Sequence, residues 1–122
     1  MVETATIDTE ALGKLLKMIG GDTEDLQELI DDYLTEAPQI AAQMTAAAQT
    51  GDSEALRRHA HTLKGNAKDF GATDLAERAA ALESGLKAGP VDDAATQVAA
   101  IVQAEEKSRA ALAALDVEAL FA

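Results

Sequence analysis

A histidine in the middle of a basic segment has neighbours that suit it to nucleophilic chemistry. The segment LRRHAHTLKGNAKDFG begins at Leu56 and ends at Gly71. When it is placed on a helix at about 100° per residue, one apolar stripe marks the buried side. The stripe consists of Leu56, Ala60, Leu63, Ala67 and Phe70. His61 then points about 140° away from the stripe, toward solvent.

Cations and one glycine share the outer half of this helix with His61. They are Arg57, Arg58, Lys64, Gly65 and Lys68. An exposed imidazole titrates near about pH 6.5, so much of it is neutral and nucleophilic at neutral pH. A histidine nitrogen can hold a phosphoryl group as a covalent intermediate. Transfer of that group depends mostly on positioning and on stabilising its negative charge, so the pattern points to phosphoryl chemistry at His61.

Two neighbours of His61 have specific expected roles. Lys64 follows at i+3, on the same face, so its ammonium group can neutralise phosphoryl oxygens. Gly65 follows at i+4, and a glycine inside a helix costs about 0.5–1 kcal/mol relative to alanine. We therefore expect Gly65 to leave room for the active site of a partner that closes over His61.

The other histidine and the serines are not predicted to take part. His59 lies only about 60° from the buried direction, which makes it a boundary residue. Histidines at i and i+2 point apart, whereas zinc-binding helices space them at i and i+4, so no metal site is predicted. The serines have no evident His–Asp arrangement, and no glycine-rich phosphate loop for ATP is present.

The composition excludes several classes of function. The chain has 122 residues and a net charge of −12, which repels nucleic acid and anionic lipid. It contains no cysteine, which removes disulfides and thiolate metal sites and is compatible with the cytoplasm. We find neither a signal peptide nor an apolar run long enough to span a bilayer. We therefore expect a soluble, cytoplasmic protein whose basic segment around His61 reverses the overall charge.

The elements that position His61 are predicted to be helices. Hydrophobic residues make up 48% of the chain but aromatic residues only 2%, so the core must be built from aliphatic side chains and alanine. Apolar periodicity predicts a single domain, 1–122, with helices at about residues 8–19, 22–49, 52–70, 73–87 and 90–115. Short turns between long helices predict an all-α fold, an antiparallel up-down-up-down four-helix bundle with a short extra N-terminal helix.

Three local features qualify this prediction. Pro38 falls inside the second helix, which we expect to be one kinked helix. Pro90 is well placed at the start of the last helix. The tail DVEALFA is left open, either as an apolar plug or as a frayed end.

An ordered set of motifs resembles the histidine-phosphotransfer (HPt) family of two-component phosphorelays. The run His61-Thr62-Leu63-Lys64-Gly65 matches the signature His-x-Leu-Lys-Gly. Further matching motifs extend over nearly the whole chain: Gly20-Gly21-Asp22, Glu36-Ala37-Pro38, Gly51-Asp52, Phe70-Gly71-Ala72 with Leu75, and Leu82-Glu83. Asn66, at a position where small residues are common in the family, is a mild departure that leaves the role of His61 intact.

The resemblance implies a bundle that carries a phosphoryl group on His61, taken from a receiver-domain aspartate and passed to another receiver. The expected partners are response-regulator receiver domains and a hybrid histidine kinase. Mg²⁺ and most catalytic groups would belong to the receiver, so the chain is expected to bind no cofactor and not to be an enzyme. Receiver active sites are acidic, and the basic residues expected to dock them are Arg57, Arg58 and Lys68. A monomer is the default, because no dimerisation helix pair is evident.

Other functions stay open at this point. The chain could be the phospho-accepting domain of a chemotaxis-type histidine kinase, loaded by an ATP-dependent kinase core. It could also be a helical adaptor that binds receivers without accepting phosphate, or, as a more distant possibility, a bundle that binds a ligand or metal. The sequence does not identify the cognate receivers or the direction in which phosphate flows.

Overall fold

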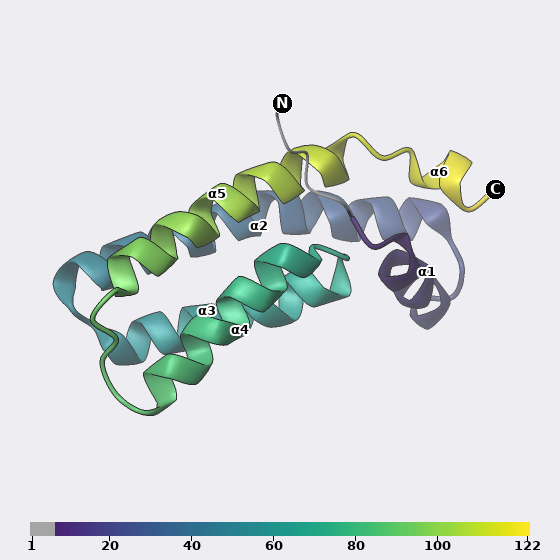
Figure 1. The fold of residues 1–122 in the computed structure, drawn as a ribbon. Coiled ribbons are helices and arrows are strands. Elements are labelled where there is room, and N and C mark those ends of the chain that lie inside the picture. The colour runs from purple at the N-terminus through teal and green to yellow at the C-terminus, as the bar shows by residue number, and fades with distance from the viewer. Residues whose placement is uncertain (1–6) are drawn as a thin grey trace.

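The structure, a computed structural model, describes residues 7–122 as an assembly of helices. The helices are α1 (Thr9–Met18), α2 (Thr23–Thr50), α3 (Ser53–Asp69), α4 (Thr73–Lys87), α5 (Ala94–Ala113) and α6 (Val117–Leu120). The four long helices α2 to α5 form a bundle in which each runs antiparallel to the next, and α1 lies at one end of it (Figure 1). Residues 7–122 contain no strand. The predicted all-α bundle with a short N-terminal helix is thus confirmed.

The core is built mainly from aliphatic side chains and alanine, as the composition requires, and Tyr33 is buried in it as well. α3 packs most extensively against α4, while α2 packs against both α5 and α3, so that the helices surround one core. The largest fully buried aliphatic side chains are Leu12, Leu26, Ile30, Met44, Leu56, Leu63, Leu75, Leu82, Ile101 and Leu112. In the described part of the chain, no helix is both long enough and apolar enough to cross a membrane.

Aspartate side chains start the first three helices. Asp8, Asp22 and Asp52 each accept a hydrogen bond from a backbone N–H in the first turn of α1, α2 and α3 respectively. Such a cap stabilises a helix by about 0.5–2 kcal/mol relative to alanine. α2 runs unbroken through Pro38 and is capped at its C-terminus by Gly51, so the prediction that a single helix, rather than two, spans Pro38 is confirmed.

The turn between α3 and α4 is held by the segment that precedes α1. Gly71 has a φ of 78°, a left-handed conformation that favours glycine. The backbone N–H of Asp8 donates a hydrogen bond to the Gly71 carbonyl at 2.8 Å. A Cβ on Gly71 would overlap the Asp8 carbonyl oxygen. The close approach of these two backbones therefore requires glycine at the turn that sets α4 beside α3.

The start of the last long helix differs from the prediction. α5 begins at Ala94, so the expectation that it starts near Pro90 is wrong. Gly89 has a φ of 132°, and the Val91 side chain lies over Gly85 of α4, packed against the core. Anchoring Val91 in this way keeps the chain in a turn for several residues after Pro90.

The C-terminal tail is an apolar plug. It forms the short helix α6, in which the Asp116 side chain accepts a hydrogen bond from the backbone N–H of Ala119. Val117 is buried, and Phe121 packs against the core and lies near Gly13 of α1. The tail therefore contributes to the end of the bundle at which α1 also lies (Figure 1).

Candidate functional site

His61 lies near the middle of α3 with its ring in solvent. Its side chain is 65% exposed, whereas Ala60 and Leu63, its neighbours on the apolar stripe, are fully buried. The structure therefore places the ring on the side of α3 to which the helical periodicity assigned it. His59, by contrast, is half-buried.

A buried carboxylate on the neighbouring helix holds the ring. The Oε2 atom of Glu83, on α4, lies 2.6 Å from His61 Nδ1. Its other oxygen, Oε1, accepts a hydrogen bond from Lys64 Nζ at 2.6 Å. The Glu83 side chain is only 5% exposed. One carboxylate thus forms hydrogen bonds with both the histidine and the lysine of the His-x-Leu-Lys-Gly motif.

The charge of Glu83 is stabilised mainly by Lys64. The hydrogen bond from the Lys64 ammonium group lowers the pKa of Glu83, and the bond to His61 adds to this effect, while burial opposes it. A second buried glutamate shows the opposite balance: at Glu105 of α5, burial raises the pKa more than the Arg109 guanidinium lowers it. The comparison indicates that Glu83 stays ionised because two hydrogen-bond donors share it.

The position of Glu83 decides how the His61 ring is protonated. An ionised carboxylate can only accept hydrogen bonds, so Nδ1 must carry the proton in this contact. The neutral ring then has its lone pair on Nε2. Since the ring is largely exposed, Nε2 is the nitrogen available to an electrophile brought by a partner.

Sequence reasoning gave Glu83 no chemical role, although it matched the residue to a family motif. One signal was present: Glu83 directly follows Leu82 and lies at the edge of the inward sector set by Leu75, Ala79 and Leu86, about 70° from its centre. A glutamate in that sector is almost never fully buried unless it is paired. That signal does not identify the partners of Glu83, because they lie on α3. They become its neighbours only when α3 and α4 pack side by side.

The other predicted site residues lie around the ring, with Lys64 in an unexpected pairing. Lys64 forms an ion pair with Glu83, whereas the sequence led us to expect that it would neutralise phosphoryl oxygens. Gly65 is exposed, and a Cβ added there would have no atom within 4 Å. The three docking candidates are partly or fully exposed and form none of the ion pairs of residues 7–122: Arg57, Arg58 and Lys68.

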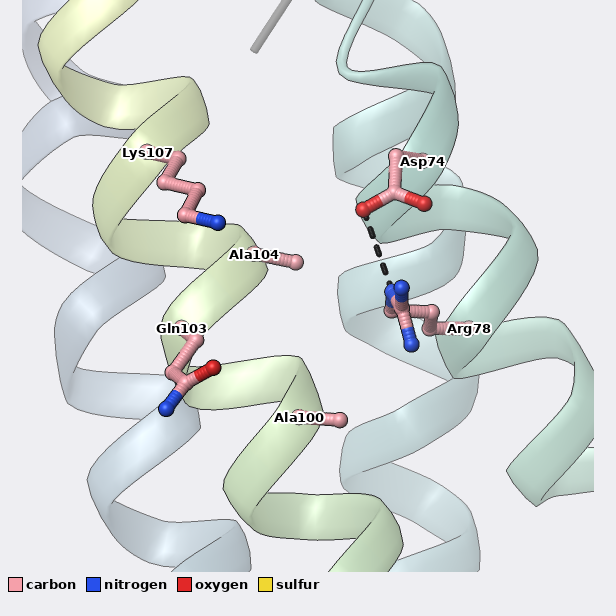
Figure 2. Close-up of a pocket in the computed structure, with 6 residues that line it drawn as sticks. All are labelled: Asp74, Arg78, Ala100, Gln103, Ala104 and Lys107. Carbon is pink, nitrogen blue, oxygen red and sulfur yellow. Dashed lines mark hydrogen bonds and ion pairs between the residues drawn. The ribbon is translucent and has the colours of Figure 1, made fainter. Parts of the chain in front are cut away.

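Two hollows in the described part of the chain are lined by side chains other than His61. A polar cleft of about 140 Å³ separates α4 from α5 (Figure 2). Its lining includes Arg78, which pairs with Asp74 at 3.1 Å, and Lys107, which reaches in from α5 (Figure 2). A second groove, lined by apolar residues such as Val98 and Val102, runs between α2 and α5. Neither hollow includes His61, whose side chain is largely exposed.

Metal chemistry has no evident ligand set in the described part of the chain. No group of three or more histidine, aspartate or glutamate side chains in residues 7–122 is placed to hold a metal ion. Glu83, which could serve as a ligand, already has both oxygens engaged by His61 and Lys64.

Comparisons with known proteins identify the family and a similar fold. The family model of the Hpt domain matches residues 28–120. The fold is similar to the crystal structure of histidine-containing phosphotransfer protein B (HptB) from Pseudomonas aeruginosa PAO1, with a TM-score of 0.78 and 24% sequence identity. That likeness covers 87% of this chain and 90% of the other. Comparison with curated proteins gives no match. On the family match, this chain belongs to the Hpt domain family, phosphocarriers that are generally not enzymes and that serve receiver domains and kinases in histidine phosphotransfer.

Proposed function

We propose that His61 is the phospho-acceptor of this protein, taking a phosphoryl group from a receiver-domain aspartate and passing it to another receiver. The observation that carries the proposal is the 2.6 Å contact between His61 Nδ1 and Glu83 Oε2 on a ring whose side chain is 65% exposed. It leaves Nε2 as a free nucleophile that faces solvent. The segment around it lies within the part of the chain matched to the Hpt domain.

The reaction is a displacement at phosphorus. The Nε2 lone pair forms the new N–P bond while the P–O bond to the receiver aspartate breaks, and the electron pair of that bond stays on the aspartate. A Mg²⁺ ion, expected in the receiver, would neutralise part of the charge on the phosphoryl oxygens. This chain supplies the nucleophile, its orientation and a docking surface. No cofactor and no ATP site of its own are part of the proposal.

Lys64 and the glycine after it support the same step. The Lys64 side chain is 33% exposed, so its ammonium group is accessible at the edge of the Glu83 contact. A phosphoryl group on Nε2 brings new negative charge that competes with Glu83 for this cation. Gly65 presents no Cβ toward a partner and has no intramolecular neighbour that demands glycine. We assign it to clearance for the receiver.

The basic side chains around His61 are assigned to docking. Arg57, Arg58 and Lys68 have no ion-pair partner in residues 7–122, which leaves them available to the acidic site of a receiver. A cytoplasmic location, which a cysteine-free chain allows, belongs to the same proposal, as does a monomeric carrier.

Phosphotransfer from a labelled phospho-receiver in the presence of Mg²⁺ tests the proposal. We expect an acid-labile, base-stable label on the wild-type chain and none on His61→Gln. The matched control is His59→Gln, which changes the half-buried histidine two residues away and should retain the label.

Three results would contradict parts of this proposal. Label that persists on His61→Gln would show that another residue is the acceptor. Label that appears only with an ATP-dependent kinase core would favour the chemotaxis-type domain. Binding of phospho-receivers with no transfer would favour the adaptor.

A further inference from the structure

The contact between Glu83 and His61 requires a proton. Glu83 Oε2 and His61 Nδ1 are 2.6 Å apart, and two lone pairs facing each other at that separation would repel. The Glu83 side chain is 5% exposed, so little of its surface is open to water that could replace the donor. Lys64 holds the other oxygen and keeps Glu83 a carboxylate, so the proton belongs to the ring nitrogen.

The same requirement holds once Nε2 carries a phosphoryl group. A ring with phosphorus on Nε2 and a proton on Nδ1 is an imidazolium, which can leave as neutral imidazole. A ring without that proton would have to leave as an anion. Resting on the function proposed above, we infer that Glu83 keeps phospho-His61 in the imidazolium form, so that loading and unloading both proceed without exchange of the ring proton.

Neither the loading step nor the unloading step requires the ring to gain or lose a proton. In loading, Nε2 bonds to phosphorus and the ring becomes positively charged, while the proton stays on Nδ1 in its hydrogen bond to Glu83. In unloading, the N–P bond breaks, its electron pair returns to Nε2, and the acceptor carboxylate oxygen forms the new bond to phosphorus. The ring ends neutral with the same Nδ1 proton. Glu83 is therefore a positioning residue that serves both steps.

Within residues 7–122, Glu83 is the hydrogen-bond partner of the His61 ring, and the other charged groups beside this pair are cations. Arg57 and Lys64 flank His61 on α3 at i−4 and i+3, and Lys87 follows Glu83 at i+4 on α4. All three are cations, which have no atom that could accept a hydrogen bond from Nδ1. Within residues 7–122, no ion pair joins His61 to α2 or α5. Retention of the proton therefore depends on Glu83.

Loss of phosphate from phospho-His61 without any receiver tests the inference. The full chain is loaded with phosphoramidate, and separately by a phospho-receiver. Its phosphohistidine is then followed by phosphorus NMR between about pH 6 and 8.5. For the wild type we expect the rate to change by less than about threefold over this range. For Glu83→Gln we expect the rate to fall at least tenfold as the pH is raised over this range, because no carboxylate then holds the proton on Nδ1.

A matched variant and a second measurement complete the test. Glu77→Gln removes an exposed carboxylate from the same helix and should retain the wild-type profile. Nitrogen chemical shifts of the phosphorylated wild-type ring need no variant to fold, and at about pH 8.5 they should show a protonated Nδ1. An unprotonated Nδ1 there, or equal pH profiles for wild type and Glu83→Gln, would overturn the inference.

Phosphoramidate separates this inference from the proposed function, because it loads the histidine without a receiver. If no phospho-receiver labels His61 while phosphoramidate does, the proposed function fails. The pH profile of the chemically loaded chain then still decides the role of Glu83.

Discussion

At the scale of single residues, the proposed nucleophile His61 is an exposed ring that Glu83 holds at one nitrogen. The exposed fraction of the His61 side chain is 65% and that of Glu83 is 5%, so the two partners lie on opposite sides of the solvent boundary. Because the His61 ring is exposed, a partner can reach Nε2. Because the Glu83 carboxylate is buried, it holds the ring in one orientation. Gly65 lies one turn after His61, and because it has no side chain, no side chain projects from the surface at that position.

Gly65→Ala is expected to raise stability and to lower activity. The added Cβ meets no atom within 4 Å, and alanine in a helix is more stable than glycine by about 0.5–1 kcal/mol. If Gly65 leaves room for a receiver, the rate of transfer at low receiver concentration should fall by about tenfold, or about 1.4 kcal/mol. Urea denaturation and transfer kinetics measure the two effects.

Gly13→Ala is the matched control for Gly65→Ala. Gly13 lies in α1, where a Cβ would make an ordinary contact at 3.6 Å with Phe121. This variant should also gain stability but transfer phosphate at the wild-type rate. An unchanged transfer rate for Gly65→Ala would remove the clearance role.

At the scale of elements, the α3–α4 pair determines the site. His61 and Lys64 come from α3, Glu83 comes from α4, and the antiparallel turn at Gly71 sets their register. That turn is in contact with the segment before α1 through the Asp8 N–H. The N-terminal helix therefore supports the site from a distance, through the backbone geometry of one turn.

Gly71→Ala is expected to destabilise the fold by about 1–3 kcal/mol. The substitution places a side chain at a φ of 78° and pushes its Cβ into the Asp8 carbonyl. Gly51→Ala is the control, because Gly51 has a similar φ of 73° but no atom within 4 Å of an added Cβ. The free energy of unfolding, measured with urea, should fall further for Gly71→Ala. Equal losses would mean that only backbone strain matters and that the Asp8 contact is unimportant.

At the scale of the whole molecule, the charge is distributed unevenly. The net charge is −12, yet Arg57, Arg58, Lys64 and Lys68 all lie on the one helix that carries His61. A receiver with an acidic active site would be repelled by most of this protein and attracted by that helix. Such a distribution orients an encounter and raises its rate more than it raises affinity.

Arg58→Glu is expected to slow association with a receiver several-fold at low salt, and the effect should shrink as salt is added. Lys107→Glu makes the same change of charge at the cleft between α4 and α5, away from His61, and should slow association less (Figure 2). Stopped-flow association rates at two or more salt concentrations measure both. Equal effects of the two variants would indicate that only net charge matters and that the basic residues form no docking surface.

Sequence alone determined the features that depend on a single helix. The apolar period of 56–70 identified the buried and exposed sides of α3, and the outward direction of His61 follows from that period. Asp8, Asp22 and Asp52 directly precede α1, α2 and α3 and cap them, and such capping is local chemistry that depends on one helix only. The ordered motifs led to the Hpt family, which the match over residues 28–120 shows.

Tertiary structure decided the features that depend on two helices at once. The bridging of His61 and Lys64 by Glu83 joins residues 19 and 22 positions apart in sequence. Helical periodicity describes how side chains are arranged around one axis, and it contains no information on the register between neighbouring axes. The late start of α5, the burial of Val117 and the close approach of Asp8 to Gly71 have the same origin. Each depends on which surface a segment meets, and only packing of the whole chain determines that.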